Sequence, residues 1–250
     1  MSPIMSMTTA PAFERTPKPE HFHAYGGKLW RIVEAQHRIS TNRLAAGAED
    51  QALLERLVEE VKPGLPVSAR HLHFLLATPF RYGHKSSSRF RGAGERPGIF
   101  YAAESVATAI AETAYWRLRF YSRSPEFAPP NTTVEHSAIS VTVVMDRMLD
   151  LCAPPYLAAA SLWMAPDDYS TCQLFAAEAR AIDTQAIRYA SVRDPEHRAN
   201  VAIFDASVFH DRAPRNAQTW HFRYEQEELT AFGAFPSNER FSFRSSDFGL

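Results

Sequence analysis

Residues 98–121 read GIFYAAESVATAIAETAYWRLRFY, and this stretch changes character halfway along. Its first part, IFYAA, has the short apolar pattern of a buried strand. Ser105 follows as an N-cap candidate, and small and apolar residues then continue at helical spacing. Glu112 is the one acid inside the apolar run. A lone helical Glu usually points to water, whereas a partly buried one needs a cation or hydrogen-bond donors.

The rest of the chain alternates predicted strands and helices. The flanking sequence predicts strands over 28–33, 136–146, 186–193 and 200–205, helices over 48–61 and 167–182, and a late strand or hairpin over 219–232. There is no internal repeat and no clean linker. We therefore expect one α+β domain over residues 21–250, preceded by a flexible tail over 1–20.

Composition and charge limit the function. The 250-residue chain has a net charge of −1, which argues against a generally basic nucleic-acid binder, and no direct nucleic-acid binding is expected. Residues 81–123 nevertheless carry eight basic and three acidic side chains, a balance of +5. This segment fits an anionic small molecule, or else a solvated charged face.

Several other site classes lack support in the sequence. The two cysteines have no metal-type spacing, and the ten histidines have no Asp, Glu or Cys at a familiar ligand spacing, so no metal site is expected. No GxSxG elbow is present. No apolar run approaches 18 residues and the N-terminus lacks a signal-peptide pattern, so we expect a cytoplasmic protein without a membrane segment.

Two further positions attract attention. Arg31 lies within the apolar strand KLWRIV, where its side chain must face solvent, an acid partner or an anionic ligand. Ser191 follows an apolar strand in YASVRD, where it could instead simply cap or turn the chain.

Arg31, Glu112 and Ser191, in this order, resemble the RES family, which is named for its Arg, Glu and Ser. The resemblance rests on LWRIVEA near the start, SRFRGAGERPGIFYAAESVATAIAET in the middle, and IRYASVRD with NVAIF towards the end. It spans roughly residues 28–205. Compared with shorter members, the chain has an insert around residues 40–80 and a C-terminal extension, and Ser87–Arg91 reads SSRFR where Gly-x-Arg-Trp-Asn is commoner.

The resemblance implies a fold and a function. RES proteins look like ADP-ribosyltransferases of the diphtheria-toxin type, with a split antiparallel or mixed sheet, flanking helices and NAD as the substrate. They are toxins of type II toxin–antitoxin pairs that arrest growth. The usual partner is an antitoxin with a helix-turn-helix, Xre-like domain that occludes the active site. One longer branch is associated with ADP-ribosylation of phosphoribosyl-pyrophosphate synthetase.

The resemblance also implies roles for individual residues. Glu112 would stabilise the oxocarbenium-like ribose formed as nicotinamide leaves, and no metal is needed because the leaving group is a pyridinium. Arg31 would hold phosphate or ribose, and Ser191 would position a ribose or nicotinamide group by hydrogen bonding. Tyr101 would border the nicotinamide, and Arg89 would contact the pyrophosphate.

Three alternatives to transfer onto a protein remain open at this point. The same site could transfer ADP-ribose to water or phosphate and so deplete NAD. The +5 segment could belong to a non-catalytic module that binds anions or nucleic acid. Finally, Glu112 and Arg31 could form an ion pair that only holds the strand to the helix.

Overall fold

A single mixed sheet organises the chain. The computed structural model describes residues 15–34, 62–124, 126–129 and 132–250. The predicted helix over 48–61, most of the tail over 1–20 and much of the insert around 40–80 lie outside these residues. The eight strands are β1 (His23–Glu34), β2 (Phe100–Ala103), β3 (Val134–Asp150), β4 (Ala186–Ala190), β5 (Ala199–Ile203), β6 (Arg215–Glu225), β7 (Glu228–Gly233) and β8 (Arg240–Arg244).

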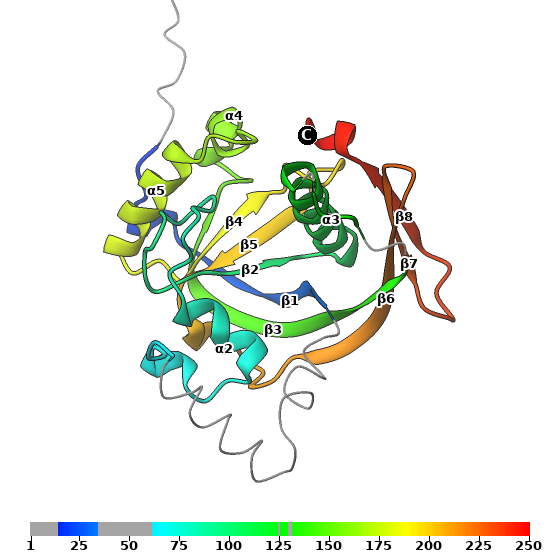
Figure 1. Ribbon diagram of the computed structural model, residues 1–250. Helices are drawn as coiled ribbons and strands as arrows, with labels where there is room; N and C mark the ends of the chain where they lie inside the picture. Colours follow the sequence, from blue (N-terminus) through cyan, green and yellow to red (C-terminus); the bar gives the residue numbers. More distant parts are fainter. Residues whose placement is uncertain (1–14, 35–61, 125, 130–131) are drawn as a thin grey trace, which may run out of the picture.

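The sheet closes on itself at one end. Its strand order is β1-β2-β5-β4-β3-β6-β7-β8, and β1 also pairs along its length with β3. Five strands therefore form a ring, from which β6, β7 and β8 extend as an antiparallel continuation of β3 (Figure 1). All neighbours are antiparallel except β3 and β4, so the sheet is mixed. The expected α+β class with a mixed sheet is confirmed.

The ring is split between β1 and β2. These strands pair at one position, Trp30 with Ala103. Beyond Trp30, β1 continues alongside β3, from Arg31 opposite Ile139 to Glu34 opposite His136, without returning to β2. The gap lies next to Arg31 on one strand and Tyr101 on the other, and each of them stays paired on its other side, Arg31 with Ile139 and Tyr101 with Ala202.

Helices cover the faces of this sheet. The helices of the described residues are α2 (Phe74–Arg81), α3 (Val106–Arg123), α4 (Ala160–Trp163) and α5 (Ser170–Ala181), with short 3₁₀ turns at Pro19–His21, Val67–Ala69, Tyr156–Ala159, Ala206–Val208 and Ser245–Phe248. The extended part of the sheet curves around α3, while α4 and α5 lie together on the other side of the ring (Figure 1). Within the described residues, no helix is long and apolar enough to cross a membrane.

The N-terminus of α3 is fixed by its cap. The Ser105 hydroxyl accepts a hydrogen bond from the Thr108 N–H at 3.1 Å, as expected for an N-cap serine. From there the helix packs Ile110, Ala114 and Leu118 against the curved sheet, all with no exposed surface. Truncating Leu118 to Ala would cost about 2–5 kcal/mol of unfolding free energy.

Helix α2 closes one end of the ring. Leu76 and Phe80 pack into the same core as Leu29 and Val143 from the ring strands. Gly98 makes this approach possible, because a Cβ there would lie 2.0 Å from the Pro79 carbonyl oxygen. The C-terminal part of the predicted insert is therefore part of the main core.

Candidate functional site

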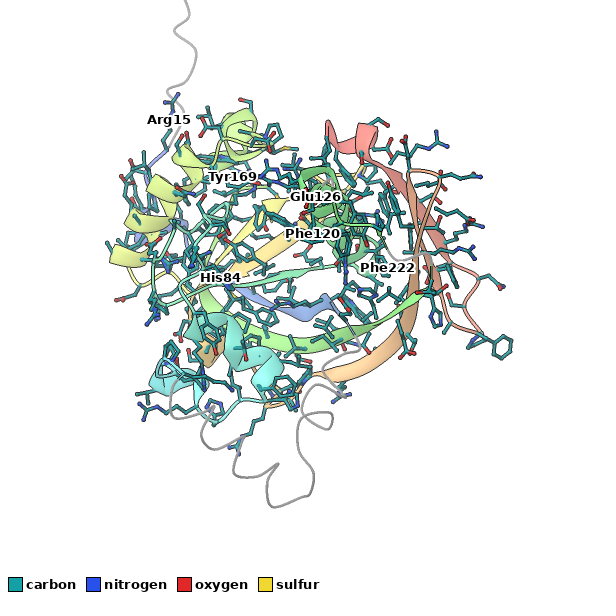
Figure 2. The ribbon with its side chains drawn as sticks, in the orientation of Figure 1. Arg15, His84, Phe120, Glu126, Tyr169 and Phe222 are labelled. Atoms are coloured by element: carbon teal, nitrogen blue, oxygen red, sulfur yellow. The ribbon has the colours of Figure 1, made fainter. Side chains whose placement is uncertain are left out.

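A cavity of about 850 Å³ opens at the split between β1 and β2. Its walls come from the end of β1, the start of α2, the loop between α2 and β2, one face of α3, and the strands β2, β4 and β5. Tyr169, at the N-cap of α5, and His84, in the loop after α2, both line it and lie on the same side of α3 (Figure 2). Four of the five predicted site residues, Arg31, Arg89, Tyr101 and Glu112, line this cavity.

Glu112 is held by two donors. Its Oε1 accepts a 2.7 Å hydrogen bond from the Ser191 hydroxyl and another of 2.7 Å from the Asn200 side-chain amide. Among the described residues Oε2 accepts no hydrogen bond. Both donors are almost fully buried, with exposed fractions of 0% and 3%. The carboxylate is therefore fixed through one oxygen, while the other is available on the wall of the cavity.

Ser191 acts on Glu112 and does not line the cavity. Its hydroxyl oxygen accepts the N–H groups of Arg193 at 3.2 Å and Asp194 at 3.0 Å. With both lone pairs engaged, the single hydroxyl hydrogen is directed to Glu112. The structure thus brings Ser191 behind the carboxylate, and the direct ligand contact expected for Ser191 stays a prediction.

Arg31 has an unsatisfied donor at the cavity. Its Nη1 atom is buried and has no hydrogen-bond partner among the described residues. The guanidinium carbon lies 5.1 Å from the centre of the Phe100 ring, and burial lowers the pKa of Arg31 without discharging it. No ion pair joins Arg31 to Glu112 in the described part of the chain, so the purely structural ion-pair hypothesis is wrong.

Tyr101 holds the loop that forms one wall. Its phenol oxygen accepts the Phe90 N–H at 3.2 Å and lies 2.9 Å from the Ser88 hydroxyl. Burial raises the pKa of Tyr101, so the phenol keeps its proton. The hydroxyl therefore serves the loop, and the contact expected between its ring and a ligand stays a prediction.

Arg89 is largely engaged in the protein. Its side chain is 9% exposed, and Nη1 donates to the backbone carbonyls of Trp163 at 2.6 Å and Ala165 at 3.0 Å. The guanidinium also lies over the Tyr169 ring at 4.8 Å. Arg89 connects the loop to the α4–α5 region, and its expected contact with pyrophosphate is not tested by this geometry.

The basic segment over 81–123 is not a free surface. Arg91 is 4% exposed and donates to the backbone carbonyls of His84, Ser86 and Gly92. Arg117 pairs with Glu34. Because several of its charges are buried or paired, the segment offers little of the exposed basic patch that a nucleic-acid-binding module requires.

Sequence reasoning missed several residues that line the cavity. Asn200 was part of a predicted strand, where a single amide among Val, Ala and Ile is the only signal of its role. Tyr189 faces Asn200 across the β4–β5 pair, and Arg193 stacks 3.6 Å from the centre of the Tyr115 ring. In the described residues, no group of three or more His, Cys, Asp or Glu side chains is arranged to hold a metal ion.

The comparison with protein-family models agrees with the sequence resemblance. The model of the RES domain matches residues 65–225, from the turn before α2 to the end of β6; Arg31 precedes this segment. A search of curated proteins gives no significant match. Among solved structures, the M. tuberculosis MbcT–MbcA toxin–antitoxin complex aligns with a TM-score of 0.44 at 13% identity, covering 80% of this chain and 86% of that one. The family model matches well over half of the sequence, and the chain belongs to the RES domain family.

Proposed function

We propose that this protein cleaves the nicotinamide–ribose bond of NAD and transfers ADP-ribose to a protein, as the toxin of a toxin–antitoxin pair. The observation that carries the proposal is the clamp on Glu112. A carboxylate fixed by Ser191 and Asn200 through Oε1 presents Oε2 to the cavity. Family membership supports the choice of NAD as the substrate.

The clamp suits the chemistry of glycosidic cleavage. As the bond to nicotinamide breaks, its electron pair leaves with the neutral nicotinamide, and positive charge develops on the ribose ring. An oriented carboxylate beside the ribose stabilises this charge and accepts hydrogen bonds from ribose hydroxyls. Orientation before the reaction matters because a mobile carboxylate would have to be ordered during the step.

Arg31 and the size of the cavity fit a dinucleotide. A volume of about 850 Å³ lies within the range of roughly 300–1,000 Å³ typical of small-molecule sites. The unsatisfied Nη1 of Arg31 is a charged donor that a phosphate or ribose oxygen would satisfy. Among the described residues that line the cavity, Glu112 is the one acid, whereas five are arginines: Arg31, Arg89, Arg91, Arg117 and Arg193.

Exposed aromatic residues at the cavity support the proposal that this protein binds a macromolecular partner there. Phe74 and Trp116 both line the cavity and have exposed fractions of 53% and 49%. Exposed aromatic side chains next to a site commonly mark a protein-binding surface. We place two partners here in turn: the protein acceptor, with phosphoribosyl-pyrophosphate synthetase as the first one to test, and an antitoxin with a helix-turn-helix domain that covers the cavity.

Two measurements test the proposal. Purified protein is incubated with labelled NAD in the presence of cell lysate or purified phosphoribosyl-pyrophosphate synthetase. We expect release of nicotinamide together with a labelled protein band. Free ADP-ribose, or its phosphate ester, without a labelled band would instead assign the reaction to hydrolysis or phosphorolysis. No release of nicotinamide under any of these conditions would reject the enzymatic proposal.

The Glu112→Gln variant tests whether the Glu112 carboxylate is needed for the release of nicotinamide. It keeps the shape of the side chain and removes the charge, so nicotinamide release should fall by at least about 100-fold. The matched control is Glu178→Gln, which makes the same change at an exposed position of α5. Equal loss in the two variants, or full activity of Glu112→Gln, would contradict the assignment.

A further inference from the structure

A buried carboxylate outside the cavity ties α3 to the turn that supplies Ser191. Asp194 lies in the connection between β4 and β5 and is 1% exposed. The turn is closed by the Ser191 N–H, which donates to the Arg198 carbonyl at 2.9 Å, and by the His197 N–H, which donates to the Asp194 carbonyl at 2.8 Å. Asp194 is therefore part of a compact and well-bonded turn.

Each oxygen of the Asp194 carboxylate accepts two hydrogen bonds. Oδ2 accepts from the Thr108 hydroxyl at 2.6 Å and from Arg198 Nε at 2.7 Å. Oδ1 accepts from Arg198 Nη2 at 2.9 Å and from the Glu196 N–H at 3.1 Å. Burial alone would raise the pKa of Asp194, but the hydrogen bonds from Arg198 and Thr108 outweigh it and lower the pKa.

The bond to Thr108 is the one that reaches the site. Thr108 has no exposed surface and lies one helical turn before Glu112 on α3. Asp194 also donates its own N–H to the Ser191 hydroxyl oxygen at 3.0 Å. One residue thus holds the helix that carries Glu112 through its side chain and orients the hydroxyl that binds Glu112 through its backbone.

We infer that Asp194 is a positioning residue for the proposed reaction, acting through Thr108 and Ser191 to set the orientation of the Glu112 carboxylate. The inference rests on the proposed function. Asp194 contacts neither the cavity nor any reacting atom, so it acts on the chemical step and leaves substrate binding nearly unchanged. Its signature is a fall in kcat at constant KM for NAD.

The test is a pair of variants at Thr108. Thr108→Val keeps the shape of the side chain and deletes the hydroxyl, whereas Thr108→Ser keeps the hydroxyl and deletes the methyl group. We expect Thr108→Val to lower kcat by about 10- to 100-fold, with KM for NAD within about twofold, because small displacements of a catalytic group have effects of this size. Thr108→Ser should retain most of the kcat of the wild type.

A structural readout makes the result independent of turnover. In a crystal structure of Thr108→Val, the Ser191 Oγ to Glu112 Oε1 distance should exceed hydrogen-bonding range. If Thr108→Val does not fold, Asp194→Asn replaces it, because it keeps the shape of the side chain and removes the charge that holds Thr108 and Arg198. If wild-type protein turns over NAD and these variants match its kcat, the positioning role is wrong; if wild-type protein releases no nicotinamide, the proposed function fails first.

Discussion

Ser191 and Glu112 are 79 residues apart in the chain and are joined by a 2.7 Å hydrogen bond in which the serine donates. The bond connects the end of β4 to the middle of α3, across the wall of the cavity. Together with the Asn200 amide it turns a helical glutamate into an oriented carboxylate. The following predictions test this site and its surroundings.

Removing either donor to Glu112 should lower the rate of NAD cleavage, and a negative charge at Asn200 should lower it more. Ser191→Ala and Asn200→Ala each remove one donor and should lower kcat for NAD cleavage by about 10- to 100-fold. Asn200→Asp should lower it further, because it places a second negative charge against Glu112. Steady-state kinetics checks the order, with Ser122→Ala at an exposed position as the control. Equal kcat for Asn200→Asp and Asn200→Ala would argue against a charged Glu112.

Arg31 should strengthen the binding of NAD and lower the stability of the folded protein. Arg31→Met removes an unsatisfied buried donor, so we expect the protein to become more stable, by about 1 kcal/mol, while KM for NAD rises at least about tenfold. Arg31→Lys keeps the charge but loses the planar fork and should be intermediate in KM. Thermal unfolding and NAD titration measure the two effects. A large loss of stability in Arg31→Met would mean that the guanidinium is structural.

Two of the tyrosines that line the cavity, Tyr189 and Tyr101, should differ in their effects on stability and activity. The Tyr189 hydroxyl makes no hydrogen bond among the described residues, and burial followed by the charge of Glu112 raises the pKa of Tyr189 well above its ordinary value. Tyr189→Phe should therefore leave the melting temperature nearly unchanged and lower kcat/KM by about tenfold through a lost ligand contact. Tyr101→Phe should instead destabilise the protein by about 1 kcal/mol, because its hydroxyl holds the loop. If Tyr189→Phe lowers the melting temperature and Tyr101→Phe lowers kcat/KM instead, the roles assigned to the two residues are wrong.

His136 should make stability depend on pH below neutrality. It is 1% exposed, and burial, with a smaller effect of Arg117, lowers its pKa below 6.5. The unfolded chain therefore binds a proton at a higher pH than the folded one, and stability falls as the pH drops from about 6.5 through the folded pKa. The slope should approach about 1.4 kcal/mol per pH unit in that window. Melting curves recorded between pH 7.5 and 5 should show this loss of stability, and His136→Gln should make the stability depend less on pH.

Local sequence patterns predicted the elements that carry the site. The strand at Tyr101 and the helix at Glu112 follow from short-range signals, including the Ser105 cap, which the structure confirms. Helix α2 and strand β8 were not predicted: α2 contains Pro79 in its last turn, and β8 is a five-residue edge strand with Arg at both ends. Such short segments take their conformation from tertiary packing, which periodicity does not reveal.

The contacts between segments far apart in the sequence could not be predicted from the sequence alone. Nothing local indicates that β1 pairs with β3 or that Asn200 reaches Glu112, since these contacts join residues about 90–125 positions apart. Thr113 and Arg117 of α3 line the cavity together with Glu112, although the sequence showed only small and apolar residues at helical spacing. The helix turns a second face to the site, and a single hydropathy stripe cannot separate the two.

The closed ring of strands joins segments that are synthesised at different times, and this determines when the site can form. β1 pairs with β3, while the clamp on Glu112 also needs Ser191 and Asn200, which lie 79 and 88 residues after Glu112 in the chain. Neither hydrogen bond to Glu112 can form before these two residues have been synthesised. A growing chain therefore contains Arg31, Tyr101 and Glu112 well before it can orient the carboxylate, so the proposed activity can begin only after Asn200 has been synthesised.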